Sequence, residues 1–126
     1  MNKVVTFGEL MLRLMPEGHH RFVQVNNFNA EFGGAEANVA VSLAQFGCDS
    51  YFVSRFPQNE IGQSAVNSIR RFGVKTDYSV RGGDRLGIYF LEKGASQRGS
   101  VCIYDRKNSA FAESSESDYD WKEIFK

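Results

Sequence analysis

The order of apolar and polar positions along residues 3–80 alternates between short apolar runs and longer helical patterns. Apolar runs cover residues 3–7 and 50–54, and a third extended segment covers residues 76–80. Between them lie two stretches with helical spacing, residues 35–46 and 59–72. This strand–helix–strand–helix–strand order predicts an α/β fold in which crossover helices connect a parallel sheet.

The helical stretch at residues 35–46 is the part of the chain best suited to approach a ligand. It contains no proline or internal glycine, and its apolar residues occur on nearly every side, so we expect a helix buried all round. Gly33 and Gly34 precede it and allow a ligand to come close to the main chain. Glu36 and Asn38 lie in its first turn, where free N–H groups and the helix dipole favour an oxygen-rich ligand.

Other apolar runs alternate with a period of two and predict a small β-layer apart from the parallel sheet. Residues 11–15 form one strand, residues 16–20 form a turn, and residues 21–25 are expected to return as the second strand. Residues 86–92 and 101–105 flank a polar loop and predict a hairpin.

Composition narrows the functional classes. A chain of 126 residues can bury the core of one small domain. Lys and Arg number 15, as do Asp and Glu, so no basic excess favours nucleic acid as a partner. No apolar run reaches membrane-spanning length, the beginning of the chain lacks a leader pattern, and the two cysteines are isolated. We therefore expect a cytoplasmic protein with no membrane partner and, because His19 and His20 have no third ligand nearby, no metal site.

The predicted hairpin carries a second group of candidate ligand-binding residues. Tyr89 lies in its first strand, and Tyr104 and Arg106 share one face of the second because a single residue separates them. A tyrosine ring with its hydroxyl suits a polyhydroxylated ligand, and the planar guanidinium of arginine suits a carboxylate or a phosphate. Cross-strand packing beside a solvated arginine is the alternative interpretation.

Taken together, these motifs resemble the PfkB (ribokinase-like) sugar kinases, and within that family the kinases of 2-keto-3-deoxygluconate. The resemblance is carried by residues 8–14, by the Gly-Gly-Ala-x-x-Asn-x-Ala run that begins at Gly33, by residues 82–87, by Tyr89 and by residues 104–106. It implies a ribokinase-like fold, an α/β part joined to a small β-sheet lid that closes over the sugar. Residues 1–126 would be the N-terminal part of this kinase domain, with lid strands at about residues 10–25 and 86–106.

For function, the resemblance implies transfer of the γ-phosphoryl group of ATP, with Mg²⁺, to the terminal hydroxyl of a sugar acid, 2-keto-3-deoxygluconate. The substrate-binding residues that it implies are Glu9, Gly33, Gly34, Ala35, Glu36, Asn38, Tyr89, Tyr104 and Arg106. Tyr89 and Tyr104 would cap the sugar, and Arg106 would hold its acid group or the phosphoryl oxygens. Glu9 stands where many relatives carry an aspartate that binds sugar hydroxyls. The lid would also be available to pair with a second subunit in a homodimer.

The sequence departs from the family in one large respect. The second family signature, a Gly-rich turn followed by the aspartate that accepts the hydroxyl proton, does not occur in it, and no Gly-x-x-x-x-Gly-Lys-Ser/Thr loop replaces it. We expect the catalytic base and the ATP site to lie beyond Lys126, so that this chain alone contains no catalytic residue and is inactive. Residues 121–125 have the spacing of a helix whose apolar face has nothing to pack against, which also suggests truncation.

Two alternatives stay open. The same scaffold serves kinases with fructokinase- or ribokinase-like specificity, and a non-catalytic sugar-binding or dimerisation module would carry the same first signature. A dinucleotide-binding protein is disfavoured, because no Gly-x-Gly-x-x-Gly follows the first strand.

Overall fold

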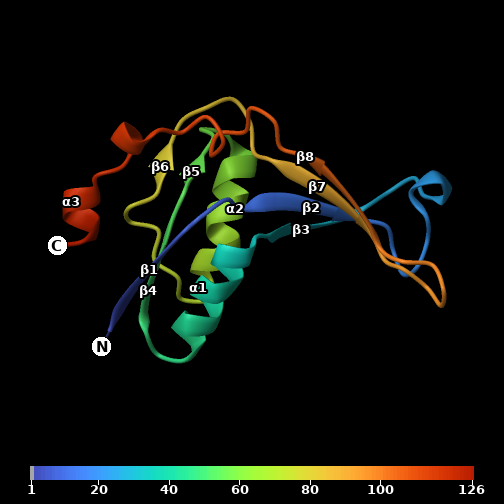
Figure 1. Cartoon of the computed structure of the whole chain (residues 1–126), viewed down its shortest axis with the longest axis horizontal. Coiled ribbons are helices and arrows are strands. Elements are labelled where there is room, and N and C mark those ends of the chain that lie inside the picture. Colours follow the sequence, from blue (N-terminus) through green and yellow to red (C-terminus); the bar gives the residue numbers. More distant parts are fainter. Residues whose placement is uncertain (1) are drawn as a thin grey trace.

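The structure, a computed structural model, describes residues 2–126. Figure 1 shows two parts: an α/β part that holds the parallel strands and both long helices, and a narrow sheet that extends from it to one side. The chain passes from one part to the other more than once, so the narrow sheet is an insertion in the α/β part. This arrangement agrees with the predicted α/β fold with a separate small β-layer.

The parallel strands are β1 (Lys3–Phe7), β4 (Asp49–Val53), β5 (Arg55–Phe56) and β6 (Val80–Arg81). β1 pairs with β4 in parallel, and β5, which continues the line of β4, pairs with β6 in parallel. An isolated parallel bridge also joins Tyr51 to Lys75. The segment that begins at Lys75 therefore lies on the side of β4 opposite β1. The connection through α2 thus joins neighbouring parallel strands, as a crossover does.

The expected continuous strand over residues 76–80 is wrong. The chain pairs at Lys75, turns, and pairs again from Val80. Ser79 explains the interruption, because its side chain takes the place of a ladder bond. Its Oγ donates to the carbonyl of Phe52 at 2.7 Å and accepts the N–H of Ser54 at 3.1 Å. A hydroxyl that satisfies both backbone groups removes the need for a continuous strand.

Two helices cover the sheet, α1 (Ala35–Gln45) and α2 (Glu60–Arg70). The N-terminus of α2 is capped by Asn59, whose Oδ1 accepts the N–H of Gly62 at 2.9 Å. The main core comprises Leu10, Ala37, Ala40, Phe52, Phe56, Ala65, Val66, Ile69, Val74 and Leu86.

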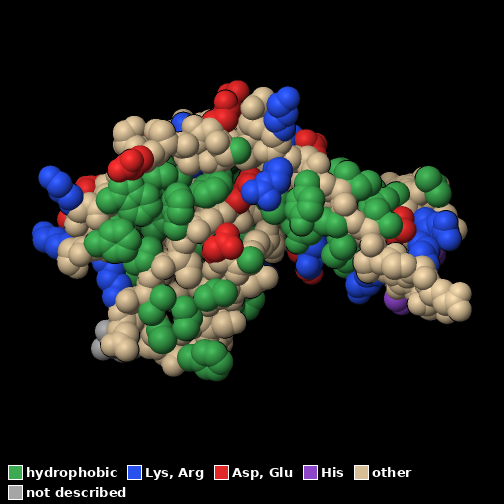
Figure 2. All heavy atoms as spheres, in the orientation of Figure 1, with side chains coloured by type: hydrophobic (Ala, Val, Ile, Leu, Met, Phe, Trp, Pro, Cys, Tyr) green, Lys and Arg blue, Asp and Glu red, His purple; other side chains and the backbone are tan. Residues whose placement is uncertain are grey.

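The expectation that α1 is buried on every side is wrong. Its buried residues are Ala37 and Ala40, whereas Val39 is 51% exposed and Phe46, just after the helix, is 82% exposed. The helix packs against β1 and β4, and all its residues other than Ala37 and Ala40 stay partly or fully exposed. Figure 2 shows several hydrophobic groups at the surface of the α/β part.

The narrow sheet has the strand order β3–β2–β7–β8. Its strands are β2 (Met11–Met15), β3 (Asn29–Gly33), β7 (Ile88–Glu92) and β8 (Val101–Asp105). β2 runs antiparallel to β3 and parallel to β7, and β7 and β8 form the predicted antiparallel hairpin.

The return strand predicted at residues 21–25 is wrong, and so is the boundary of 25 for the first lid segment. Phe22–Gln24 form a short 3-10 helix (η1), and the strand that pairs with β2 is β3. The N–H of Arg21 donates to Gln24 Oε1 at 2.8 Å, and the N–H of Phe22 donates to the buried carboxylate of Glu92 at 2.9 Å. Because side chains satisfy these donors, the segment does not need a strand partner.

The C-terminal segment also packs better than expected. A short 3-10 helix, η2 (Glu116–Asp118), precedes the four-residue helix α3 (Trp121–Ile124). Ile124 is 1% exposed and belongs to a second core cluster with Val53 and Tyr119, and the Trp121 ring lies 5.3 Å from that of Phe7. The prediction that this apolar face has nothing to contact is therefore wrong, although Phe125 remains 70% exposed.

Candidate functional site

A cavity of about 390 Å³ opens where the carboxyl end of β1 meets the beginning of α1 and the end of β8. Its lining residues are Phe7, Gly8, Glu9, Met11, Gly34, Ala35, Glu36, Tyr104, Arg106 and Phe111. Open α/β sheets bind their ligands beyond the carboxyl ends of the parallel strands. The cavity has this position, and side chains from the narrow sheet form its opposite wall.

Glycines bring the backbone close together around this cavity. A Cβ on Gly34 would overlap the carbonyl oxygen of Glu9, and it would lie 3.5 Å from the Cα of Leu10. A Cβ on Gly8 would overlap the carboxylate of Glu36. The first residues of α1 therefore approach the β1–β2 connection to a distance that side chains would prevent.

Charged side chains meet at the floor of the cavity. The Glu9 side chain is 5% exposed, and its Oε1 lies 2.8 Å from Nη2 of Arg106, which is 48% exposed. Ser109, fully buried, donates its hydroxyl to Glu9 Oε2 at 2.7 Å. Glu36 adds a second carboxylate to the lining. The cavity thus carries two carboxylates and one guanidinium.

The two tyrosines stack on one face of the hairpin. Tyr89 and Tyr104 are directly opposite each other in the β7–β8 register, and their ring centroids lie 5.8 Å apart. Tyr104 lines the cavity, whereas the hydroxyl of Tyr89 lies over Gly33, where a Cβ would be 2.6 Å from it. Interaction with the neighbouring Cys102 side chain raises the pKa of Tyr104 above its ordinary value. As for any tyrosine, the phenol is protonated at neutral pH and has an O–H donor.

The structure brings most of the predicted residues together. Those that line the cavity are Glu9, Gly34, Ala35, Glu36, Tyr104 and Arg106. Gly33 and Tyr89 contact each other next to it without lining it.

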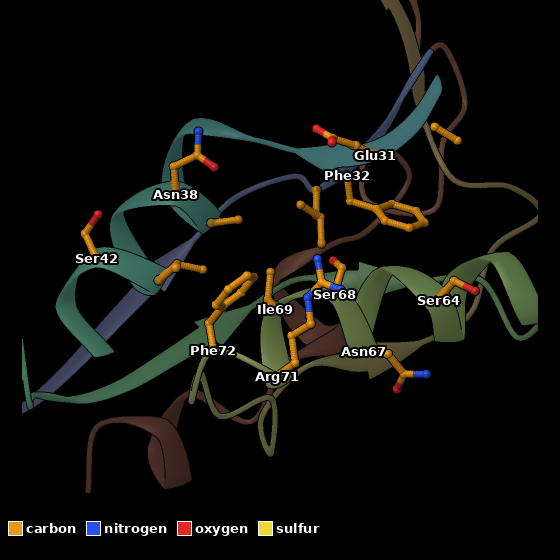
Figure 3. Close-up of a pocket in the computed structure, with 14 residues that line it drawn as sticks. Glu31, Phe32, Asn38, Ser42, Ser64, Asn67, Ser68, Ile69, Arg71 and Phe72 are labelled. Carbon is orange, nitrogen blue, oxygen red and sulfur yellow. The ribbon is translucent and has the colours of Figure 1, made fainter. Parts of the chain in front are cut away.

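Asn38 lies apart from the other predicted residues. It lines a second cavity, of about 850 Å³, between α1, α2 and β3. Figure 3 shows Asn38 and Ser42 along α1 on one side of this cavity, with Ser64 and Asn67 on α2 on the other. Residues two positions apart on a helix are separated by about 200°. Glu36 and Asn38 therefore leave the helix in nearly opposite directions, and each lines a different cavity.

Sequence reasoning missed two residues at the site, Ser109 and Phe111. Ser109 holds Glu9, and Phe111 lines the cavity and packs 5.3 Å from the ring of Phe7. Both follow β8 outside every recognised motif, so no periodicity or spacing pointed to them. Only the contact between the segment after β8 and the end of β1 reveals their position.

The described part of the chain offers neither a metal-binding cluster nor a membrane-spanning helix. In residues 2–126 no group of three or more His, Cys, Asp or Glu side chains is arranged to hold a metal ion. Over the same residues, none of the helices has the length and apolar character needed to span a bilayer.

The parallel sheet, the β insertion and the cavity between them match the α/β part, the small β-layer and the binding site that the resemblance to sugar kinases implies. The whole chain, residues 1–126, matches the pfkB family carbohydrate kinase domain, and it belongs to this family. The resemblance inferred from the sequence is thereby confirmed.

Named relatives support this membership. The chain is 33% identical over 108 residues to a 2-dehydro-3-deoxygalactonokinase of Haloferax volcanii, covering 86% of this chain and 34% of that protein. It is 28% identical over 116 residues to a 2-dehydro-3-deoxygluconokinase of Bacillus subtilis, covering 91% of this chain and 36% of that protein.

A solved structure of a 2-dehydro-3-deoxygluconokinase from Thermotoga maritima is also similar. It superimposes with a TM-score of 0.97 at 56% identity, covering 99% of this chain and 38% of that one. The predicted ribokinase-like fold is thereby confirmed. The chain spans little more than a third of the length of each of these relatives.

Proposed function

We propose that this chain forms the sugar-binding part of an ATP-dependent kinase of 2-keto-3-deoxygluconate, the compound also called 2-dehydro-3-deoxygluconate. The observation that carries the proposal is the guanidinium of Arg106 at the edge of the cavity. Its Nη2 contacts Glu9. No other described residue in 2–126 forms a hydrogen bond with the guanidinium group. Arginine has five N–H donors, so Arg106 retains donors for the carboxylate of a sugar acid.

The beginning of α1 supplies groups for the rest of the sugar. Gly34 is its N-terminal cap and provides no side-chain acceptor, and the first intrahelical bond runs from the N–H of Asn38 to the carbonyl of Gly34. The N–H groups of Ala35 and Glu36, which precede that bond, are therefore available to hydroxyl or keto oxygens. Opposite them, Tyr104 offers a ring and a protonated hydroxyl.

Phosphoryl transfer requires groups that we do not assign to this chain. The reaction needs a base for the hydroxyl proton, bound ATP, and Mg²⁺ to offset the phosphate charge. The buried carboxylate of Glu9 is held by Arg106 and Ser109, which makes it a poor candidate for the base. We place the base and the ATP site in the additional length that the relatives possess, and we therefore propose that this chain is inactive by itself.

We also propose that the narrow sheet is a lid and that it pairs with a second copy through β8. β8 is an edge strand, and all five of its residues are exposed, including Val101 at 41% and Ile103 at 49%. An open apolar edge favours pairing with another strand. Light scattering of the wild-type chain and Ile103→Lys tests this: a dimer that the substitution dissociates is expected, and a wild-type monomer at high concentration would contradict it.

Calorimetric titration of the purified chain with 2-keto-3-deoxygluconate, fructose, ribose and MgATP, each added separately, tests the proposed function. Tighter binding of the sugar acid than of either neutral sugar, without binding of MgATP, is the expected result. Preferential binding of fructose or ribose would favour the alternative specificity. Binding of MgATP would refute our placement of the nucleotide site.

A further inference from the structure

The ion pair between Glu9 and Arg106 has a consequence for ligand selection. A carboxylate within this protein already contacts the guanidinium that we assign to the carboxylate of the substrate. We propose that Glu9 competes internally for Arg106 and thereby makes the cavity selective for ligands that carry both a carboxylate and hydroxyl groups. This inference rests on the proposed function and assigns Glu9 a role in specificity in addition to contact with the sugar.

The packing fixes Glu9 for this role. Ser109 donates to Glu9 Oε2 at 2.7 Å, and its own Oγ accepts the N–H of Ala112 at 3.1 Å, so the hydroxyl is held from both sides. Gly87 leaves room for the pair, because a Cβ there would lie 2.5 Å from Oε2 and 3.2 Å from the Cβ of Arg106. Ser109 and Gly87 therefore act as positioning residues, which orient Oε1 of Glu9 toward Arg106.

The contact between Glu9 Oε1 and Arg106 Nη2 is one that a ligand can replace. Glu9 Oε1 lies 2.8 Å from Arg106 Nη2 but accepts no well-aligned hydrogen bond from any described residue. Arg106 is 48% exposed, so the attraction is screened by water. A ligand carboxylate can displace Glu9 by forming the paired, parallel hydrogen bonds that guanidinium groups favour.

Displacing Glu9 from Arg106 costs free energy, and only some ligands can offset this cost. Glu9 is almost fully buried, and a buried carboxylate that loses its partner is destabilised unless another donor replaces it. A sugar acid brings both groups: its carboxylate takes Arg106, and a hydroxyl donates to Glu9 Oε1. A simple anion brings no donor, and a neutral sugar does not displace Glu9. The second carboxylate in the lining, Glu36, further disfavours anions that lack hydroxyls.

Pyruvate is a suitable probe of this selectivity, because it shares the 2-keto acid group of the proposed substrate but lacks hydroxyls. We compare the affinities for 2-keto-3-deoxygluconate and pyruvate by calorimetry in the wild-type chain and in Glu9→Gln. Gln keeps a side-chain oxygen for the Ser109 hydroxyl but no longer neutralises Arg106. The ratio of the two affinities is expected to fall about tenfold, mainly through tighter pyruvate binding.

Glu31→Gln is the matched control. It removes a carboxylate from another ion pair, with Arg13, between β2 and β3, and it does not line the cavity. Its affinity ratio should equal that of the wild type. Glu9→Asp serves as a second variant if Glu9→Gln does not fold, since it retracts the charge from Arg106 and should shift the ratio in the same direction.

The outcomes separate the two proposals. A wild-type chain that binds the sugar acid, with an unchanged ratio in Glu9→Gln, would overturn the competition by Glu9 and leave the proposed function intact. A wild-type chain that binds pyruvate more tightly than 2-keto-3-deoxygluconate would overturn the proposed function itself. Absence of sugar-acid binding in both chains would overturn both.

Discussion

Replacement of Gly34 by alanine perturbs the contact on which the cavity depends. Gly34 has φ −178°, an extended conformation that alanine adopts without strain. The substitution therefore tests only whether the structure has room for the added Cβ. The added Cβ would overlap the carbonyl oxygen of Glu9. Backbone atoms cannot move aside as the end of a flexible side chain can, and α1 must therefore shift away from the β1–β2 connection.

The magnitude follows from typical costs of overpacking, about 1–3 kcal/mol. For a domain of 126 residues, the entropy of unfolding is about 0.26 kcal/mol per kelvin. The melting temperature should therefore fall by about 4–11 °C. Because the shift also separates the two walls of the cavity, affinity for the sugar acid should fall as well.

Thermal unfolding followed by circular dichroism measures this effect. Gly99→Ala is the control, because a Cβ on Gly99 meets nothing within 4 Å. It also reproduces the loss of unfolded-state entropy that any Gly-to-Ala change brings. Equal melting temperatures for Gly34→Ala and Gly99→Ala would refute the argument from close backbone approach.

Two further predictions concern stability. Arg98→Ala removes the guanidinium that lies 2.9 Å from the buried carboxylate of Glu92, and it should lower the free energy of unfolding in urea by about 1–3 kcal/mol. Arg21→Ala, which loses no ion pair, is the control, and an equal loss in both variants would contradict this reasoning. Burial raises the pKa of Tyr119 above its ordinary value, which favours the protonated phenol in the folded state. The stability that this pKa difference contributes is intact below about pH 10 and is lost as the pH rises further. The melting temperature of Tyr119→Phe should therefore fall less steeply above that pH than the melting temperature of the wild type. Identical curves for the two proteins would contradict this role of Tyr119.

The fold was largely predictable because its main elements have strong local patterns. β1, α1, α2 and the β7–β8 hairpin follow from apolar periodicity, and Asn59 marks the start of α2 through its own side chain. The errors occur where side chains replace backbone pairing. Within the interrupted segment, the Ser79 hydroxyl bonds to the backbone of Phe52 and Ser54, at the end of β4. The carboxylate of Glu92 accepts the N–H of Phe22 across 70 residues of sequence. No local pattern encodes contacts of this kind.

The candidate site was predictable in its members but not in its geometry. Motifs placed Glu9 and Arg106 among the ligand-binding candidates, but the contact between them depends on how the segment after β8 returns to the end of β1. The role of Ser109 could not be predicted from the sequence for the same reason, because its contact with Glu9 also depends on this return. The motif that contains both Glu36 and Asn38 did not reveal that they line different cavities.

The central claim is that Arg106 binds the carboxylate of a sugar acid in this cavity. Its most direct test is the affinity of Arg106→Gln for 2-keto-3-deoxygluconate, measured by calorimetry beside Arg13→Gln. Arg13 also forms an ion pair in the narrow sheet but does not line the cavity. The claim predicts at least about tenfold weaker binding by Arg106→Gln, the loss expected for a charge-assisted hydrogen bond, and wild-type affinity for Arg13→Gln. Equal affinity in all three chains would contradict it.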